Sequence, residues 1–299
     1  MQVVSMKNIL KTGGVTFLLM FLVMISNHAM ANSHRVVAID GSITEIIYAL
    51  GKEQSLVGRD VTSLYPKDAE KLPSVGYMRS LSAEGILSLK PTLVLATSDA
   101  KPQSVLKRLK DAGVHIQIIP NAYSIEGVKQ KILTVARALN DEPAGEKLAN
   151  QFQQKADSAI ALAKERAALQ GERKALFLLN ARGNQLLVAG TQTRADEVLQ
   201  LAAIQNPAAK DMQGYKPLTA EGAIQYNPSY IIALQTQMTE QHLEAILEQP
   251  ALKMTSAAKE KHFMVLAGDD LSFGPRLPEV IRKLSDKVYG QTETNRTED

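Results

Sequence analysis

The stretches LSAEGILSLKPTLVLA at positions 81–96 and LTAEGAIQYNPSYIIA at positions 218–233 align without a gap and share Leu, Ala, Glu, Gly, Pro and Ala. A Gly-Tyr pair precedes each stretch, at 76–77 and at 214–215. Each copy predicts a helix that ends before a proline and a buried strand that follows it. An internal repeat of this kind indicates two related lobes, with chance similarity between two α/β units as the alternative.

Strands and helices alternate on both sides of the repeat. We expect strands at 35–39, 55–58, 91–97, 115–120, 174–180 and 229–235, and helices at 43–50, 102–112 and 193–202. Ser42 and Glu45 have the spacing of a capping box, which is favoured over a nucleophilic role for Ser42. Short strands that alternate with helices predict an α/β fold with mostly parallel sheets.

One long helix is expected to join the two lobes. Between 143 and 170, apolar residues recur every three or four positions, namely Leu148, Phe152, Ala156, Ile160, Ala163 and Ala167. At 1.5 Å per residue this helix is roughly 40 Å long, and it would have to bend if the lobes moved far. The chain thus divides into an N-terminal lobe at 32–142, a linking helix at 143–171 and a C-terminal lobe at 172–299 with a polar tail.

The composition is that of a folded globular protein. Of 299 residues, 45% are hydrophobic and 22% are charged, and the formal net charge is +3. A nearly neutral chain argues against a nucleic-acid-binding protein, which normally has a basic surface. Cysteine is absent, which excludes disulfides, thiolate zinc sites, cysteine nucleophiles and a lipid-anchored N-terminal cysteine.

The first residues have the pattern of an export signal. Lys7 and Lys11 precede the apolar run VTFLLMFLVMI at 15–25, and AMA at 29–31 matches a small-x-small cleavage site. The run is shorter than the roughly 20 residues that span a bilayer. We therefore expect cleavage after Ala31 and a periplasmic protein with no stable membrane insertion, a retained anchor being the alternative.

These features resemble the helical-backbone class of periplasmic substrate-binding proteins, which supply ABC importers with haem, ferric siderophores or cobalamin. More narrowly, GYMRSLSAEGILSLKPTLVLA at 76–96, VGRDVTSLYP at 57–66 and FGPRLPE at 273–279 resemble the periplasmic haem-binding proteins. The likeness covers nearly the whole mature chain. It implies a monomeric non-enzyme that captures ferric haem b and delivers it to the permease dimer of an inner-membrane ABC importer.

The resemblance places Tyr77 at the position of the axial tyrosine that binds haem iron. A phenolate is a hard anionic ligand that suits ferric iron. A free phenol has a pKa of about 10, so the bound iron and a nearby cation must stabilise the anion. Arg79 matches the residue that supports the tyrosine. The alternative for Tyr77 is an ordinary half-buried loop tyrosine.

Other residues are candidates for the walls of the site. Tyr215 is the repeat equivalent of Tyr77, and it is expected either to line the pocket or to pack between the lobes. Cations for the haem propionates could come from Arg59, Lys101, Arg182 and Lys216, and competing tyrosines are Tyr65, Tyr123 and Tyr226. Arg276 has two interpretations, as a partner of a haem propionate or as a turn residue, and the sequence does not decide between them. No histidine follows the strand at 174–180 and no basic residue stands at 236–238, which weakens the case for a second haem.

Glu84 and Glu221 occupy matching positions in the two copies of the repeat. The resemblance implies that these carboxylates meet arginines on the two permease subunits, while a preference for acids at helix starts is the alternative. A ferric-siderophore or cobalamin-binding protein of the same class is a second interpretation of the function. A metal-ion-binding protein is disfavoured by unclustered histidines, and an exported enzyme by the absence of G-x-S-x-G, H-E-x-x-H and P-loop motifs.

Overall fold

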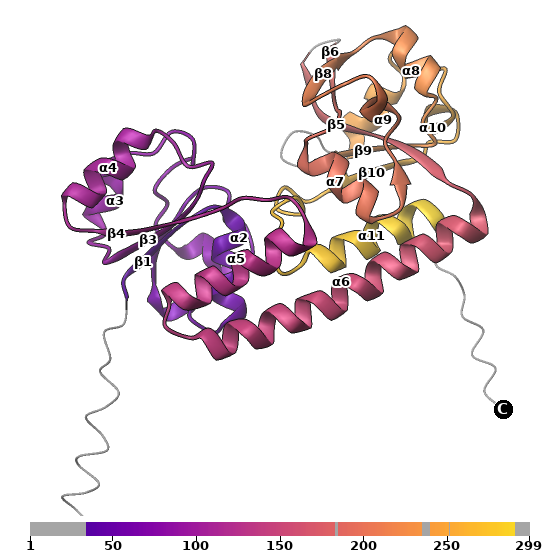
Figure 1. Ribbon diagram of the computed structural model, residues 1–299. Helices are drawn as coiled ribbons and strands as arrows, with labels where there is room; N and C mark the ends of the chain where they lie inside the picture. The colour runs from indigo at the N-terminus through magenta and orange to yellow at the C-terminus, as the bar shows by residue number, and fades with distance from the viewer. Residues whose placement is uncertain (1–33, 183–184, 235–239, 251, 291–299) are drawn as a thin grey trace, which may run out of the picture.

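The computed structural model describes residues 34–182, 185–234, 240–250 and 252–290, and it has two α/β lobes joined by one long helix (Figure 1). This confirms the predicted fold class. The export signal expected at 1–31 and the tail after Gly290 lie outside the described residues. Among the helices in the described ranges, none has the length and apolar character needed to cross a bilayer.

Four parallel strands form the N-terminal sheet. They lie in the order β2 (Leu56–Arg59), β1 (Val36–Ile39), β3 (Leu93–Thr97) and β4 (His115–Ile119). Helices α2 (Gly41–Ala49) and α5 (Ile125–Ala138) cover one face, and α3 (Ala83–Ser88) and α4 (Gln103–Asp111) cover the other. Because alternate side chains of a strand point to opposite faces, Val36 packs towards α2 and α5 whereas Val37 packs towards α3 and α4.

The C-terminal sheet is mixed. Its strands follow the order β10 (Phe263–Leu266), β9 (Tyr230–Leu234), β5 (Arg173–Arg182), β6 (Gln185–Ala189) and β8 (Tyr215–Leu218), and β7 (Ile204–Gln205) also pairs with β5. β10, β9 and β5 are parallel, whereas β6 is antiparallel to β5 and β8. Helices α8 (Ala220–Tyr226), α9 (Glu240–Leu247) and α10 (Ser256–Lys259) pack on one face, and α7 (Arg194–Leu201) and α11 (Leu277–Tyr289) on the other. The antiparallel β6 is a feature that the sequence interpretation missed.

The repeat in the sequence forms the same unit in both lobes, α3 with β3 and α8 with β9. The hydroxyl groups of Ser82 and Thr219 cap the two helices by accepting the main-chain N–H three residues on, at 3.4 and 3.0 Å. A residue with positive φ follows each helix, Lys90 at 49° and Asn227 at 38°. Matching caps and matching turns explain why two stretches of limited identity adopt one structure.

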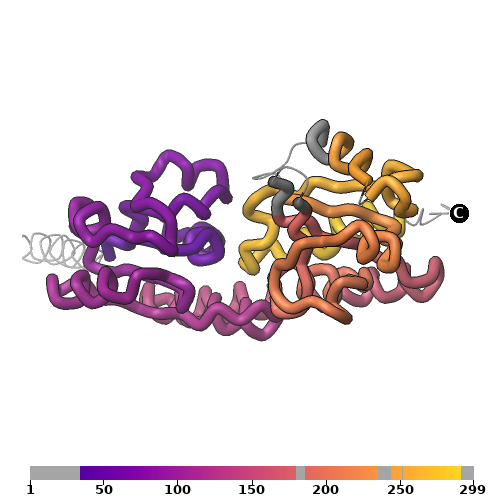
Figure 2. The backbone as a smooth tube through the Cα atoms, turned by 90° about the horizontal axis from the view of Figure 1, so that it is seen from above, coloured from indigo at the N-terminus to yellow at the C-terminus, as the bar shows by residue number. Residues whose placement is uncertain are grey.

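Helix α6 (Glu142–Gln170) connects the lobes and has 29 residues. The predicted boundaries agree with it to within one residue. Its buried face consists mostly of small side chains around Phe152, and α5 and α11 pack along it. One hydrophobic core runs from the N-terminal lobe past α6 and α11 into the C-terminal lobe, and Figure 2 shows both lobes seated on α6.

The capping box predicted for Ser42 and Glu45 is wrong. The N-cap residue of α2 is Asp40, whose carboxylate accepts the N–H of Ser42 at 2.8 Å. Glu45 is buried and accepts the main-chain N–H of Arg276 at 2.6 Å instead. Because α2 begins directly after β1, the aspartate at the end of the strand already occupies the capping position.

Candidate functional site

Tyr77 lies on the loop between β2 and α3. Main-chain hydrogen bonds fix this loop, because the carbonyl of Gly76 accepts from Val61 at 2.9 Å and the carbonyl of Met78 accepts from Lys101 at 2.8 Å. Val61 and Lys101 follow the carboxyl ends of β2 and β3, the edge at which open α/β sheets bind ligands. The Tyr77 residue is 43% exposed, so its ring is accessible at a fixed place on this edge.

Two exposed cations lie on the segments around Tyr77. Arg79 belongs to the turn that follows the tyrosine, and its side chain is exposed. The main chain of exposed Lys101 binds on both sides of Arg79, with its N–H on Met78 and its carbonyl accepting from Leu81 at 3.0 Å. The structure therefore brings the segments of Arg79 and Lys101 together beside Tyr77.

Tyr215 has a different environment from Tyr77. The segment from Gly214 to Leu218 is one residue shorter than the matching segment of the first copy, and Tyr215 begins strand β8 instead of lying on a loop. Burial raises the pKa of Tyr215, while Arg194 and a hydrogen bond with Thr193 lower it. Tyr215 thus lies half-buried near the junction of the lobes.

The predicted propionate cations are distributed differently. The guanidinium of Arg59 donates to the carbonyls of Ala69, Asp60 and Glu70, each at 3.2 Å, and so anchors the segment after β2 within its own lobe. Lys216 is exposed on β8 next to Tyr215. Arg182 ends strand β5, and its side chain lies outside those described, as do residues 236–238.

The competing tyrosines have partners within the protein. The ring of Tyr65 lies 3.6 Å from the guanidinium carbon of Arg276. The hydroxyl of Tyr226 donates to Asp211 at 3.1 Å, and that of Tyr123 donates to Asp99 at 3.0 Å. By contrast, Tyr77 combines an exposed ring with nearby exposed cations.

Arg276 has a structural role. Its guanidinium pairs with Asp269 and lies 3.5 Å from the carboxylate of Glu45, so it joins the segment before α11 to the N-terminal lobe. Burial raises the pKa of Glu45 to about 7 despite this neighbour. These ion pairs favour a structural role for Arg276 in the turn.

Lys131 is a buried polar residue that the sequence interpretation missed. It is 1% exposed, and its ammonium donates to Ser42 at 2.8 Å, to Asn121 at 3.1 Å and to the carbonyl of Phe273 at 3.2 Å. Burial lowers its pKa to about 8. A lysine on the apolar face of α5, between Val128 and Ile132, is the sequence signal that could have identified it.

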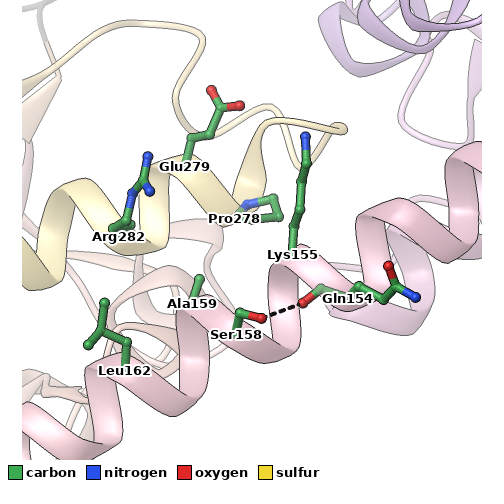
Figure 3. A pocket seen from close by; sticks show the side chains of 8 residues that line it. All are labelled: Gln154, Lys155, Ser158, Ala159, Leu162, Pro278, Glu279 and Arg282. Atoms are coloured by element: carbon green, nitrogen blue, oxygen red, sulfur yellow. Dashed lines mark hydrogen bonds between the residues drawn. The ribbon is translucent and has the colours of Figure 1, made fainter.

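A separate hollow of about 440 Å³ lies between α6 and α11 (Figure 3). It is lined by Gln154, Lys155, Ser158, Ala159 and Leu162 of α6 and by Pro278, Glu279 and Arg282 of α11. Most of these side chains are polar, Leu162 is the large apolar one, and they include none of the predicted site residues. The hollow is therefore distinct from the Tyr77 loop.

Glu84 and Glu221 are both exposed in the first turn of their helices, α3 and α8. Both helices lie on the side of their lobe away from α6 (Figure 1). Glu84 also borders a hollow of about 790 Å³ formed by α3 and α4. The two glutamates are thus equivalent surface residues on two equivalent helices.

Proteins of known structure share this architecture and are similar in sequence. The structure superimposes on the periplasmic heme-binding protein RhuT from Roseiflexus sp. RS-1 with a TM-score of 0.80 and 34% identity, covering 86% of this chain and 98% of that one. A periplasmic heme-binding protein from Pseudomonas aeruginosa gives a TM-score of 0.80 and 31% identity, covering 87% and 94%.

Curated relatives point to the same kind of protein. An uncharacterised ABC transporter substrate-binding lipoprotein, YvrC of Bacillus subtilis, is 28% identical over 261 residues, which are 86% of this chain and 81% of the relative. A vitamin B12-binding protein of Vibrio parahaemolyticus is 25% identical over 232 residues, 76% of this chain and 82% of the relative. The family model described as periplasmic binding protein matches residues 36–269. The chain therefore belongs to the periplasmic binding protein family.

Proposed function

We propose that the protein captures haem between its two lobes, with the phenolate of Tyr77 as the axial ligand of ferric iron. The observation that carries this proposal is the exposed ring of Tyr77 on a fixed loop, with Arg79 two residues further on. An arginine near a phenolate favours the anion that binds iron. The structural similarity to heme-binding proteins supports haem as the ligand class.

The haem propionates need cationic or hydrogen-bonding partners. Arg79 and Lys101 are the candidates beside Tyr77, and Lys216 with Tyr215 is the candidate in the C-terminal lobe. Arg59 is a weaker candidate because its guanidinium already donates to three main-chain carbonyls. Arg182 is also proposed as a cation for the propionates, as expected from the sequence.

A hemin titration followed by visible absorption tests the assignment of Tyr77. Tyr77→Phe removes the oxygen but keeps the ring, so we expect loss of the phenolate charge-transfer band and a much weaker complex. Arg79→Ala should weaken binding by roughly 10- to 100-fold, as is usual for residues that support a metal ligand. Tyr65→Phe is the matched control, because Tyr65 is similarly exposed, at 41%, in the same lobe. An unchanged spectrum and affinity in Tyr77→Phe would refute axial coordination.

Vitamin B12 is the second candidate ligand, because a B12-binding protein is among the sequence relatives. Titration with cyanocobalamin, and competition between cyanocobalamin and hemin, separates the two ligands. We expect hemin to bind and cyanocobalamin not to displace it. A ferric siderophore used in the same competition tests the third member of the class.

The remaining assignments follow from capture and transport. The protein is proposed to be an exported monomer that breaks no bond in its ligand, with residues 1–31 as a signal peptide. The lobe boundaries are proposed to lie at 142 and 171, next to the ends of α6. Glu84 and Glu221 are proposed to dock on the permease dimer of an ABC importer, one from each lobe.

A further inference from the structure

Three charged side chains from both lobes meet at the lobe junction. Arg194 of the C-terminal lobe places Nη2 3.6 Å from Asp40 and 3.7 Å from Asp99, both in the N-terminal lobe. Its guanidinium carbon lies 4.7 Å from the centroid of the Tyr123 ring, and Nη1 donates to the carbonyl of Leu271 at 3.3 Å. We name Asp40, Asp99 and Arg194 the interlobe latch.

The two carboxylates are held in place by their own lobe. Asp40 is 2% exposed, and it accepts from the hydroxyl of Ser42 at 2.6 Å in addition to the main-chain bond that caps α2. Asp99 accepts from the amide of Asn121 at 2.9 Å and from the hydroxyl of Tyr123 at 3.0 Å. Both acids follow the carboxyl ends of parallel strands, β1 and β3, so the N-terminal lobe presents a prepared anionic site to its neighbour.

Within its own lobe Arg194 has a neutral partner, the carbonyl of Leu271, whereas its charged partners Asp40 and Asp99 lie in the other lobe. Arg194 is the first residue of helix α7, and a cation at a helix N-terminus is disfavoured by the helix dipole. Asp40 and Asp99 are the attractive charges beside it, and the presence of Asp40 raises the pKa of Arg194 against the opposing effect of burial. The interaction that accounts for this arginine is therefore the one between the lobes.

The latch is connected to both sides of the proposed haem site. On one side, the N–H of Asp40 donates to Asp60 at 3.2 Å, and the next residue, Val61, donates to Gly76 beside Tyr77. On the other side, Arg194 adjoins Thr193, whose hydroxyl donates to the carbonyl of Gly190 at 2.9 Å, and the N–H of Gly190 donates to Gly214 beside Tyr215 at 2.8 Å. A change in the latch therefore acts on the separation of the Tyr77 loop and strand β8.

We propose that Arg194 is a positioning residue that sets the separation of the two lobes by closing on Asp40 and Asp99. The effect on ligand affinity rests on the proposed function, but the lobe separation exists without any ligand. Loss of the latch shifts the lobes apart and weakens hemin binding by roughly tenfold, within the usual range for coupling between sites.

The chain is well suited to a distance measurement because it contains no cysteine. Lys110→Cys on α4 and Lys259→Cys on α10 place one exposed thiol on each lobe for nitroxide labels. Arg194→Gln is compared in this background by pulsed electron spin resonance of the ligand-free protein. Arg137→Gln is the matched control, because it breaks an exposed arginine–glutamate pair between the end of α5 and Glu142 at the start of α6.

We expect Arg194→Gln to give a longer and broader distance distribution, Arg194→Lys to lie between it and the parent, and Arg137→Gln to match the parent. If Arg194→Gln does not fold, Asp99→Asn tests the same contact from the other lobe. A distribution identical to the parent overturns the proposal, even if hemin affinity falls, because the arginine would then touch the ligand directly. If the parent does not bind hemin, the proposed function fails while the distances still decide the role of the latch.

Discussion

At the scale of single residues, Glu45 shows how a contact between distant segments changes an ordinary acid. Its carboxyl group receives the N–H of Arg276 and the hydroxyl of Ser272, and it is almost completely removed from water. Burial is the dominant influence and raises the pKa of Glu45 from 4.5 to about 7. The folded protein therefore keeps a proton on Glu45 at a pH where the unfolded chain has lost it.

The pH dependence of stability follows from this difference. Between pH 4.5 and 7 the folded state binds more protons at Glu45, so the contribution of Glu45 to the free energy of unfolding falls as pH rises. The fall is at most on the order of 3–4 kcal/mol, at about 1.4 kcal/mol per pH unit. Glu45→Gln keeps an acceptor for Arg276 and cannot titrate, so the unfolding free energy of the wild type minus that of Glu45→Gln should fall as pH rises across this window.

Chemical denaturation at a series of pH values measures this difference. Glu165→Gln, on the exposed face of α6, is the control and should follow the wild type at every pH. Parallel profiles for wild type and Glu45→Gln would show that Glu45 does not titrate abnormally.

The residues predicted from sequence and those that the sequence interpretation missed differ in how far apart their partners lie. Tyr77 and Arg79 are neighbours in the chain, so their spacing could be recognised without a structure. Arg194, Asp40 and Asp99 come from three different elements, and no local pattern connects them. The expected strand ends indicated which polar residues lie at the edges of the sheets. Which of these residues pair with one another is determined by the packing of the lobes.

At the scale of elements, the contact between α5 and α6 depends on a residue without a side chain. A Cβ atom at Gly145 of α6 would collide with the Cβ atom of Ala136 of α5. Gly145→Ala should therefore destabilise the protein by about 1–3 kcal/mol, the usual cost of overpacking, although alanine favours a helix by about 1 kcal/mol.

Gly85 in α3 is the matched comparison, because a Cβ atom there meets nothing closer than Ser82, at 3.9 Å. Gly85→Ala should be neutral or stabilising by up to about 1 kcal/mol. Thermal unfolding of both variants checks the pair. Equal effects of the two substitutions would contradict the packing argument.

The elements predicted from sequence are those with a strong local pattern. The repeat, the long helix and the N-terminal strands are confirmed because buried periodicity and caps specify them. The hairpin of β5 and β6 was missed because the strand was expected to end at Asn180, although Gly183-Asn184 before an apolar run is a hairpin signal in the sequence. The predicted capping box is wrong because Asp40 and Ser42 are both suitable capping residues at the start of α2, and Asp40 occupies the N-cap.

At the scale of the whole molecule, the two lobes present equivalent acids to a partner. The double variant Glu84→Ala, Glu221→Ala should leave hemin affinity unchanged, because both residues are exposed in the first turn of their helices and neither is a candidate partner of the haem. Hemin transport by the importer in reconstituted vesicles should fall, since the docking charges are lost. Exposed ion pairs contribute only about 0.2–1 kcal/mol each. Because salt screens such pairs, docking of the wild-type protein on the importer should also weaken as the salt concentration rises.

A matched control uses acids elsewhere on the surface, such as Glu165→Ala with Glu248→Ala, one on α6 and one after α9. This pair should transport hemin like the wild type. Full transport by the Glu84→Ala, Glu221→Ala protein would refute the docking role.

The segment before α11 has a consequence for how the molecule is made. Lys131 donates to the carbonyl of Phe273, 142 positions further along the chain, and Glu45 accepts the N–H of Arg276, 231 positions further along. Synthesis proceeds from the N-terminus, so the first lobe is complete in sequence long before these partners exist. A chain that stops short of Phe273 leaves an ammonium and a carboxyl group at an unfinished surface, where unpaired charge opposes burial. The N-terminal lobe therefore reaches its final form only when the end of the chain has been synthesised.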